Sequence, residues 1–330
     1  MAASRRSPAV PFALLALLVV TPLASQVPVT VSGRIVRTGE ADGEPVGGAA
    51  VTLHRISRTA QGAVDSLRTG SDGRFRFSLA GDTTAVYLVS ARFAGIEYFG
   101  PPLRTPGARD LEIVVSDTSS TAPVTLAARR VIIRRPDESG TRLVVDLFSL
   151  RNDGTMTRVG KDSLSPSWQV VLPAGVLQAE VQEGDVSPTA VRFAGDTLLV
   201  LAPIAPGQKN VMVSYRIPMG HAEASWTAPA DSFDLMVEEP SATVTGAGLA
   251  AVAPIEVEEA RFLRWSAVPP ERSGVATVQF GDAAVARTRV LVWLVAAMIL
   301  VGGALGAWAL RGRRRRPGDE STLARGRSHR

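Results

Sequence analysis

The chain has 330 residues, a length typical of about two or three domains. Its hydrophobic content of 45% is usual for a folded protein, and the absence of cysteine excludes disulfides, thiolate metal sites and a lipidated cysteine. The formal net charge of +5 comes from the two ends, because residues 26–310 hold fewer basic than acidic side chains. The sequence therefore does not predict a nucleic-acid partner.

The N-terminal segment has the pattern of an export signal. Two arginines precede an apolar run over 9–20, and small residues follow it. We expect a signal peptide over residues 1–25, cleaved after Ala24 or Ser25. The alternative is an uncleaved anchor, but a run of about 12 residues is too short to cross ~30 Å of hydrocarbon. The residues after the arginine pair do not resemble a twin-arginine motif, which favours the ordinary export route.

Residues 26–116 alternate between apolar and polar side chains in short runs. Turn signals separate these runs, for example Asp42-Gly43 and Asp72-Gly73. About seven short strands in such a length predict a small β-sandwich.

Three sequence blocks in this region resemble a known family. They are Val-Ser-Gly-Arg-Ile-Val over 31–36, Pro-Val-Gly-Gly-Ala-Ala-Val-Thr-Leu over 45–53 and Thr-Gly-Ser-Asp-Gly-Arg-Phe-Arg-Phe over 69–77. Their order is that of the carboxypeptidase regulatory-like domain, and the resemblance covers about residues 27–116. It implies a transthyretin-like sandwich, often grouped with carbohydrate-binding-like folds, and an accessory, non-catalytic role. The family has no shared catalytic residues to carry over.

A polar segment over 117–123 is expected to be a linker, and strand patterns resume in residues 124–286. No long amphipathic helix interrupts them. This region forms one large sandwich or two small ones, and we favour one Ig-like sandwich with a trailing sheet. The fold class expected for the exported part is all-β.

The C-terminal part predicts one transmembrane helix over residues 290–310, which carry no charge and would span about 31 Å as a helix. Trp293 and Trp308 lie near its ends, where indole rings favour the membrane interface. The tail over 311–330 begins with a basic cluster, and such clusters stay in the cytoplasm. The basic residues of this cluster are Arg311, Arg313, Arg314, Arg315 and Arg316.

These features predict a single-pass protein of the cytoplasmic (inner) membrane, with its N-terminal ectodomain outside the cytoplasm. Gly302 and Gly306 form a Gly-x-x-x-Gly pair that can bring two helices together, although glycine is common in membrane helices and we favour a simple stop-transfer anchor. The abundance of arginine over lysine, with much alanine, is typical of a GC-rich bacterial genome.

No catalytic, cofactor-binding or metal-binding set stands out in the sequence. The three histidines, His54, His221 and His329, are scattered, and the catalytic His-x-x-Glu spacing of metallocarboxypeptidases is absent. The string Gly246-Ala-Gly248-Leu-Ala-Ala251 fits a dinucleotide fingerprint only as letters, because Pro254 leaves no room for the helix that must follow. We expect no enzyme, no cofactor and no metal.

The remaining candidates for ligand contact are Trp168, Trp226 and Trp265, since exposed indoles stack on the apolar faces of sugars. The alternative is that they fill a sandwich core, as indoles often do. The leading hypothesis is a membrane-anchored accessory or scaffold protein of the bacterial envelope that contacts another envelope protein. The alternative hypothesis is a carbohydrate-binding module tethered to the membrane.

Overall fold

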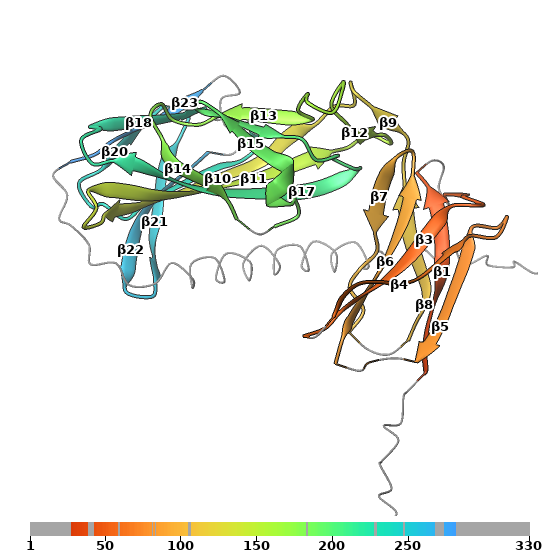
Figure 1. Cartoon of the computed structure of the whole chain (residues 1–330). Coiled ribbons are helices and arrows are strands. Elements are labelled where there is room, and N and C mark those ends of the chain that lie inside the picture. The colour runs from red at the N-terminus through yellow and green to blue at the C-terminus, as the bar shows by residue number, and fades with distance from the viewer. Residues whose placement is uncertain are drawn as a thin grey trace, which may run out of the picture. The chain divides into compact units, whose positions relative to one another are not determined.

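A computed structural model describes residues 28–281, except 39–42, 59, 81, 83, 105–106, 183, 228–229, 247 and 268–273. Apart from the short 3-10 helix η1 (Pro188–Ala190), every regular element of this described part is a β-strand (Figure 1). The chain divides into two compact units at the Asp117–Thr118 junction.

The first unit consists of two four-stranded sheets. In one, β1 pairs antiparallel with β2 and β5 and parallel with β8; the other is antiparallel throughout, in the order β4-β3-β6-β7. The strands are β1 (Pro28–Arg37), β2 (Glu44–Pro45), β3 (Ala50–Ile56), β4 (Gln61–Arg68), β5 (Arg74–Ala80), β6 (Val86–Phe93), β7 (Ile96–Phe99) and β8 (Ala108–Val115).

Alternate residues of both sheets form the core of the first unit, because successive side chains of a strand point to opposite faces. The buried members are apolar and come from five strands. They are Val31, Ile35, Val51, Leu53, Phe75, Phe77, Tyr87, Val89, Ala91, Ile113 and Val115. Two sheets that bury one face each against the other define a β-sandwich.

The second unit is built on one seven-stranded sheet, ordered β14-β17-β11-β10-β19-β22-β21, with β10 and β19 parallel. Two three-stranded sheets, β13-β16-β15 and β18-β23-β20, complete it together with the short pair β12-β9. The strands are β9 (Thr118–Ser119), β10 (Thr125–Pro136), β11 (Thr141–Asn152), β12 (Thr157–Arg158), β13 (Trp168–Val171), β14 (Leu177–Val181), β15 (Val191–Ala194), β16 (Thr197–Val200), β17 (Gly207–Pro218), β18 (Glu223–Thr227), β19 (Phe233–Val237), β20 (Thr243–Thr245), β21 (Ala250–Val257), β22 (Ala260–Ala267) and β23 (Val275–Gln279).

The large sheet buries side chains on both of its faces. Val131 and Ile133 of β10 belong to the main core, which also takes Leu198 of β16 and Val278 of β23 from the small sheets. Ile132, between them in sequence, belongs to a separate cluster with Val145, Met212 and Phe262. Because neighbouring residues of one strand face opposite ways, these two cores lie on opposite faces of the sheet.

The expected all-β fold is confirmed, as is its β-sandwich character. The segment expected as a linker contains β9, which pairs in parallel with β12. Within the described residues, no helix is long and apolar enough to cross a bilayer. The predicted signal peptide (1–25), transmembrane helix (290–310) and tail (311–330) lie outside the described residues, and so do all the residues proposed for the anchor.

Candidate functional site

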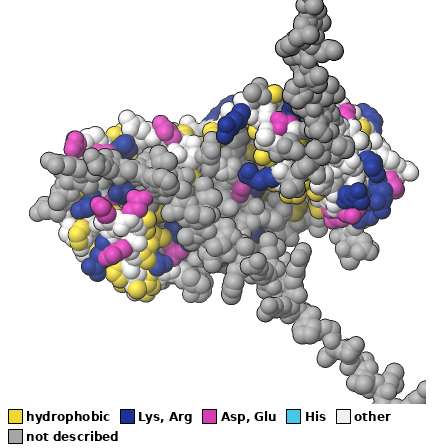
Figure 2. All heavy atoms as spheres, turned by 90° about the horizontal axis from the view of Figure 1, so that it is seen from below, with side chains coloured by type: hydrophobic (Ala, Val, Ile, Leu, Met, Phe, Trp, Pro, Cys, Tyr) yellow, Lys and Arg dark blue, Asp and Glu magenta, His cyan; other side chains and the backbone are white. Residues whose placement is uncertain are grey.

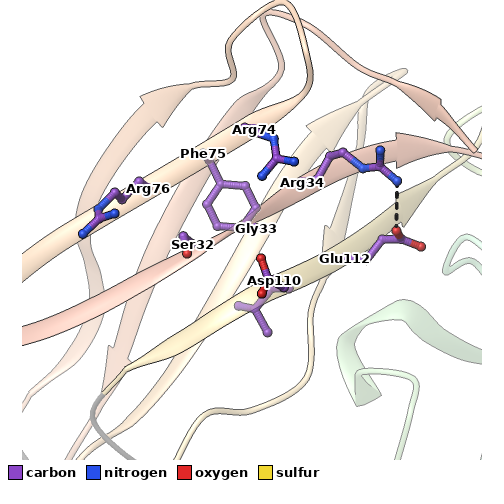
Figure 3. Close-up of a pocket in the computed structure, with 9 residues that line it drawn as sticks. Ser32, Gly33, Arg34, Arg74, Phe75, Arg76, Asp110 and Glu112 are labelled. Atoms are coloured by element: carbon purple, nitrogen blue, oxygen red, sulfur yellow. Dashed lines mark hydrogen bonds and ion pairs between the residues drawn. The ribbon is translucent and has the colours of Figure 1, made fainter.

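A hollow of about 650 Å³ lies on the sheet of the first unit that contains β1. Its lining combines three arginines, two acids and small or apolar residues from the three neighbouring strands β5, β1 and β8 (Figure 3). The lining residues are Ser32, Gly33, Arg34, Arg74, Phe75, Arg76, Asp110, Leu111 and Glu112. We call this surface the arginine hollow.

An irregularity in the β1–β8 pairing shapes the arginine hollow. Val31 pairs with Ala108 but Gly33 pairs with Leu111, so β8 has one extra residue between these pairs. Within this bulge Asp110 adopts a left-handed backbone conformation with φ of 58°, which aspartate tolerates better than most residues. Gly33 is required opposite it, because an added Cβ would lie 2.1 Å from the carbonyl oxygen of Leu111.

Charges of both signs face the arginine hollow. Arg34 forms an ion pair with Glu112 at 3.4 Å, and Arg74 forms one with Asp72 at 3.4 Å. Figure 3 shows Arg74 and Asp110 on opposite sides of β1. No ion pair joins Arg76 or Asp110 to another described residue within 4.0 Å. The surface therefore presents one cation and one anion that are open to pairing with a partner.

A second hollow, of about 570 Å³, lies in the second unit beside Trp168. Its lining contains an indole, two cations and several hydroxyl groups, but no acid. The lining residues are Ser120, Val124, Arg158, Lys161, Ser165, Pro166, Ser167, Trp168 and Gln169. We call this surface the indole hollow.

The three tryptophans proposed for ligand contact occupy different environments. Trp226 is 0% exposed, and its Nε1 donates a hydrogen bond to the Tyr215 hydroxyl at 2.6 Å, so its indole offers no face to a ligand. Trp265 is partly buried and packs against the main core. Trp168 is also partly buried, but it lines the indole hollow. Of the three, Trp168 alone lines a described hollow.

His54 belongs to a chain of three polar side chains, which the scattered histidines of the sequence did not indicate. Its Nε2 lies 2.8 Å from the Ser90 hydroxyl, which donates to Glu97 at 2.6 Å. The three residues come from β3, β6 and β7, whose register places them diagonally on one face. A strand pattern cannot show this, because it does not contain the pairing register.

The His54–Ser90–Glu97 chain differs from the arrangement of a nucleophilic triad. In such a triad the imidazole lies between the hydroxyl and the carboxylate. Here the hydroxyl lies between the two, and Glu97 also approaches the same Nε2 at 3.6 Å. Ser90 is 2% exposed, so a substrate would not reach its oxygen. These three groups connect adjacent strands of the sheet.

The second unit contains a buried charged network. Arg129 donates two hydrogen bonds to Asp146, at 3.1 and 2.6 Å, and a third to the Thr227 carbonyl at 2.6 Å. Tyr215 donates to Asp146 at 3.1 Å. Burial raises the pKa of the Tyr215 hydroxyl well above its usual value, and the Asp146 carboxylate acts in the same direction. All these groups are satisfied inside the core, which gives them a structural role.

Arg142 and Glu239 form a second buried pair at 3.0 Å, and the guanidinium lies over the Phe280 ring, 4.0 Å from its centroid. Next to this pair, Glu238 accepts hydrogen bonds from the side chains of Arg134 and Arg135. Among the described residues, no three His, Cys, Asp or Glu side chains come together as a metal site would require.

No protein-family model matches the sequence, and no curated protein sequence matches it. The solved structures that match include an M1 zinc metallopeptidase from Deinococcus radiodurans and leukotriene A4 hydrolase from Saccharomyces cerevisiae. Their sequence identities are 11% and 12%, each covers 47% of this chain, and each has a TM-score of 0.30. The matched part spans 42% of the first structure and 29% of the second.

Both of these structures are enzymes by name, which stands against the prediction that the protein is not an enzyme. That prediction came from scattered histidines and missing catalytic motifs, which cannot exclude an unfamiliar site. The likeness concerns fold alone at this identity, so it transfers no catalytic residue, metal or substrate to this chain.

Proposed function

We propose that this chain is a membrane-anchored accessory or scaffold protein of a bacterial envelope, which contacts another envelope protein. The support for the anchor is the pattern of the two ends, an export signal over 1–25 and an uncharged segment over 290–310 with arginines after it. In this proposal the protein is a single-pass protein of the inner membrane with its two β units outside the cytoplasm and its tail inside.

The finer fold assignments are part of the same proposal. The sequence blocks that resemble the carboxypeptidase regulatory-like domain fall on β1, β3 and β5 of the first unit. Its two four-stranded sheets are compatible with a transthyretin-like sandwich. The second unit, a large sheet covered on one face by two small sheets, is proposed to be Ig-like.

The arginine hollow is the observation that carries the protein-contact proposal. Arg76 and Asp110 carry opposite charges on one concave surface and have no ion pair with a described residue. Complementary charges of both signs fix the register and orientation of a protein partner. On the described surface in Figure 2, acidic and basic side chains are interspersed, so a hollow with two signs favours a protein over a polyanion.

Site-specific photocrosslinking tests this contact in intact cells with the full chain. A photoreactive residue at position 76 should give one discrete adduct with an envelope protein. The matched control is position 92, an exposed arginine on the other sheet of the same unit, which should give none. Equal crosslinking at both positions, or none at position 76, would contradict the proposal.

The topology has its own test. A reporter that is active only in the cytoplasm, fused after Arg330, should be active. Activity of an exported reporter at the same position would overturn the proposed orientation.

A second candidate function is carbohydrate binding by the second unit. The specific observation that favours it is the indole hollow, where Trp168 is partly open beside hydroxyl-bearing and amide side chains. An indole stacks on the apolar face of a sugar ring while polar neighbours bind its hydroxyls. A glycan array probed with the full chain in detergent tests this function, and a blank array would remove it.

A further inference from the structure

The indole hollow has a charge pattern that narrows the class of sugar it could hold. Two of its nine lining residues, Arg158 and Lys161, are cations and none is an acid. Between described residues, no ion pair within 4.0 Å involves either cation. The arginine hollow, by contrast, includes two acids among its lining residues.

Trp168 is held in place from behind by the core. Its ring meets Phe148 edge-on with centroids 5.5 Å apart, and Phe148 in turn lies under the Arg129 guanidinium at 4.8 Å. Its backbone begins β13 and pairs with Val200 of β16. A ring fixed by such contacts loses little conformational entropy when a ligand stacks on it.

Arg158 is fixed in the same region and has an unused donor. Its Nη1 donates to the Ala122 carbonyl at 2.9 Å, and its backbone pairs with Ile204. Its Nε is buried and has no hydrogen-bond partner in the described part of the chain. Because a buried atom is not reached from the hollow, a ligand would bind the other nitrogens of this half-buried guanidinium.

Lys161 lies in a tightly folded loop. An added Cβ on Gly160 would lie 2.0 Å from the Ser165 carbonyl oxygen, so the chain folds back closely here. The Asp162 carboxylate accepts hydrogen bonds from the Leu164 and Ser165 amides and from the Ser165 hydroxyl, at 2.8 to 2.9 Å. These contacts hold the acid nearest in sequence to Lys161 within the loop and leave Lys161 exposed.

We propose that the indole hollow binds an acidic sugar, one that carries a carboxylate or a phosphate, and this inference rests on the carbohydrate-binding function proposed above. The indole of Trp168 stacks on the apolar face of the sugar ring. Arg158 and Lys161 bind the acidic group, because charge-assisted hydrogen bonds are stronger than neutral ones. The amide of Gln169 binds the sugar hydroxyls, and the Ser165 hydroxyl, which already donates to Asp162, accepts from them.

The test compares a glucuronic acid trimer with a neutral glucose trimer of the same linkage, by calorimetry on the full chain in detergent micelles. The acidic trimer should bind at least about tenfold more tightly, since loss of a charged hydrogen bond commonly costs a factor of ten or more. A glucose phosphate tests whether phosphate replaces carboxylate. If only the glucose phosphate binds, the ligands of the hollow are restricted to phosphorylated sugars, and the proposal of an acidic sugar is still supported.

The two lysines of the chain, Lys161 and Lys209, provide a matched control. Lys161→Gln should weaken acidic-trimer binding about tenfold, whereas Lys209→Gln, on β17 and outside the lining, should leave it unchanged. The acidic trimer should also slow acetylation of Lys161 without slowing that of Lys209, as read by mass spectrometry. Trp168→Ala should abolish binding. If the Trp168→Ala variant does not fold, the result for Lys161→Gln decides whether the indole hollow is the binding site.

The outcomes separate the inference from the function on which it rests. Equal affinity for acidic and neutral trimers, unchanged in Lys161→Gln, would overturn the acidic sugar and keep carbohydrate binding. Acidic binding that survives both Trp168→Ala and Lys161→Gln would overturn the site. No binding of any glycan would overturn the inference together with the carbohydrate-binding function, and leave the protein-contact function in place.

Discussion

The two units of this chain handle charge in different ways. Among the described residues, the first unit buries no charged side chain, and its ion pairs lie at the surface. The second unit buries five charged residues, each less than a tenth exposed: Arg129, Arg142, Asp146, Glu238 and Glu239. Surface ion pairs contribute little to the stability of a protein, whereas removing one partner of a buried ion pair destabilises the folded protein strongly. The stability of the second unit should therefore depend on a few ion pairs that have no equivalent in the first.

The face of the sheet on which the charged side chains lie provides a physical reason for this difference. In the first unit each sheet buries a single face, so charged side chains on the other face remain in water. In the second unit Asp146 lies on the face of the seven-stranded sheet that the two small sheets cover, because it pairs with Val131 of the main core. An enclosed carboxylate requires a cation and donors beside it, and Arg129 and Tyr215 supply them.

The largest expected effect comes from removing the cation of the buried network. Arg129→Met leaves Asp146 without its cation and should destabilise the second unit by about 3–5 kcal/mol. All three described tryptophans lie in this unit, so urea unfolding of the full chain in detergent can be followed by indole fluorescence. The matched control is Arg192→Met, an exposed arginine on β15, with little expected change. A loss below about 1 kcal/mol in Arg129→Met would contradict the contrast between the units.

The stability of the first unit should instead depend on the close contact between β1 and β8 at Gly33. Gly33→Ala places a methyl group 2.1 Å from the Leu111 carbonyl oxygen and should destabilise the first unit by about 1–3 kcal/mol. Hydrogen exchange of β1 and β8 should increase while the indole-monitored transition stays unchanged. In Gly220→Ala the added methyl meets nothing within 4 Å, and exchange of these strands should not change. Unaltered hydrogen exchange in Gly33→Ala would show that β1 and β8 accommodate the methyl group without loss of stability.

Acid should weaken the second unit through Asp137. Burial alone would raise the pKa of this carboxyl, but hydrogen bonds from Ser139 and Arg216 and the charge of Arg216 lower the pKa to about 2. A folded pKa below the unfolded value of about 3.9 stabilises the protein above that pH, and this stability is lost as the pH falls from about 4 to 2. Asp137→Asn should cost about 1 kcal/mol at neutral pH, discounted for solvent screening. The urea midpoints of the unmodified protein and of Asp137→Asn should converge by about pH 2. A difference that stays constant with pH would exclude the ionised Asp137 carboxylate as the cause of the acid sensitivity.

The smallest expected effect is at the surface of the first unit. Glu112→Gln removes the ion pair with Arg34, in which more than a third of each side chain is exposed. Such pairs contribute about 0–1 kcal/mol, and salt screens them. The melting temperature should therefore change by no more than a few degrees, and added salt should reduce the difference. A loss comparable to that of Arg129→Met would remove the distinction between the two units.

Local pattern alone was sufficient for part of the candidate sites. The alternation around Phe75 and Phe77 predicted a strand, and both side chains are buried as that alternation requires. The sequence identified the tryptophans as candidates for ligand contact, but it could not show which of them are buried and which one lines a hollow. Trp226 and Trp168 are both at strand positions, yet one is enclosed by the main core and the other lines a hollow at the start of β13.

The other residues of the sites could not be found from the sequence. The arginine hollow requires β5, β1 and β8 side by side, and β8 joins β1 in parallel from more than 70 positions away along the chain. The ion pair of Arg129 with Asp146 is also absent from the sequence pattern, because the pairing of β10 with β11 brings the two side chains together. The prediction that the protein is not an enzyme was also based on motifs contiguous in sequence, and the two structures reported above, which are enzymes by name, stand against it.

By itself the sequence determined the strand content, the absence of disulfides and the expectation of an export signal and anchor, because each of these is written in neighbouring residues. The tertiary structure alone decided the pairing of strands, the parallel neighbours β1–β8 and β10–β19, and the burial of particular charges. These depend on register and on which sheet face is covered, and both are set by contacts between residues far apart in the chain. Arg158, Lys161 and Trp168 are close in sequence, but their common hollow depends on more distant pairings, of Arg158 with Ile204 and of Trp168 with Val200.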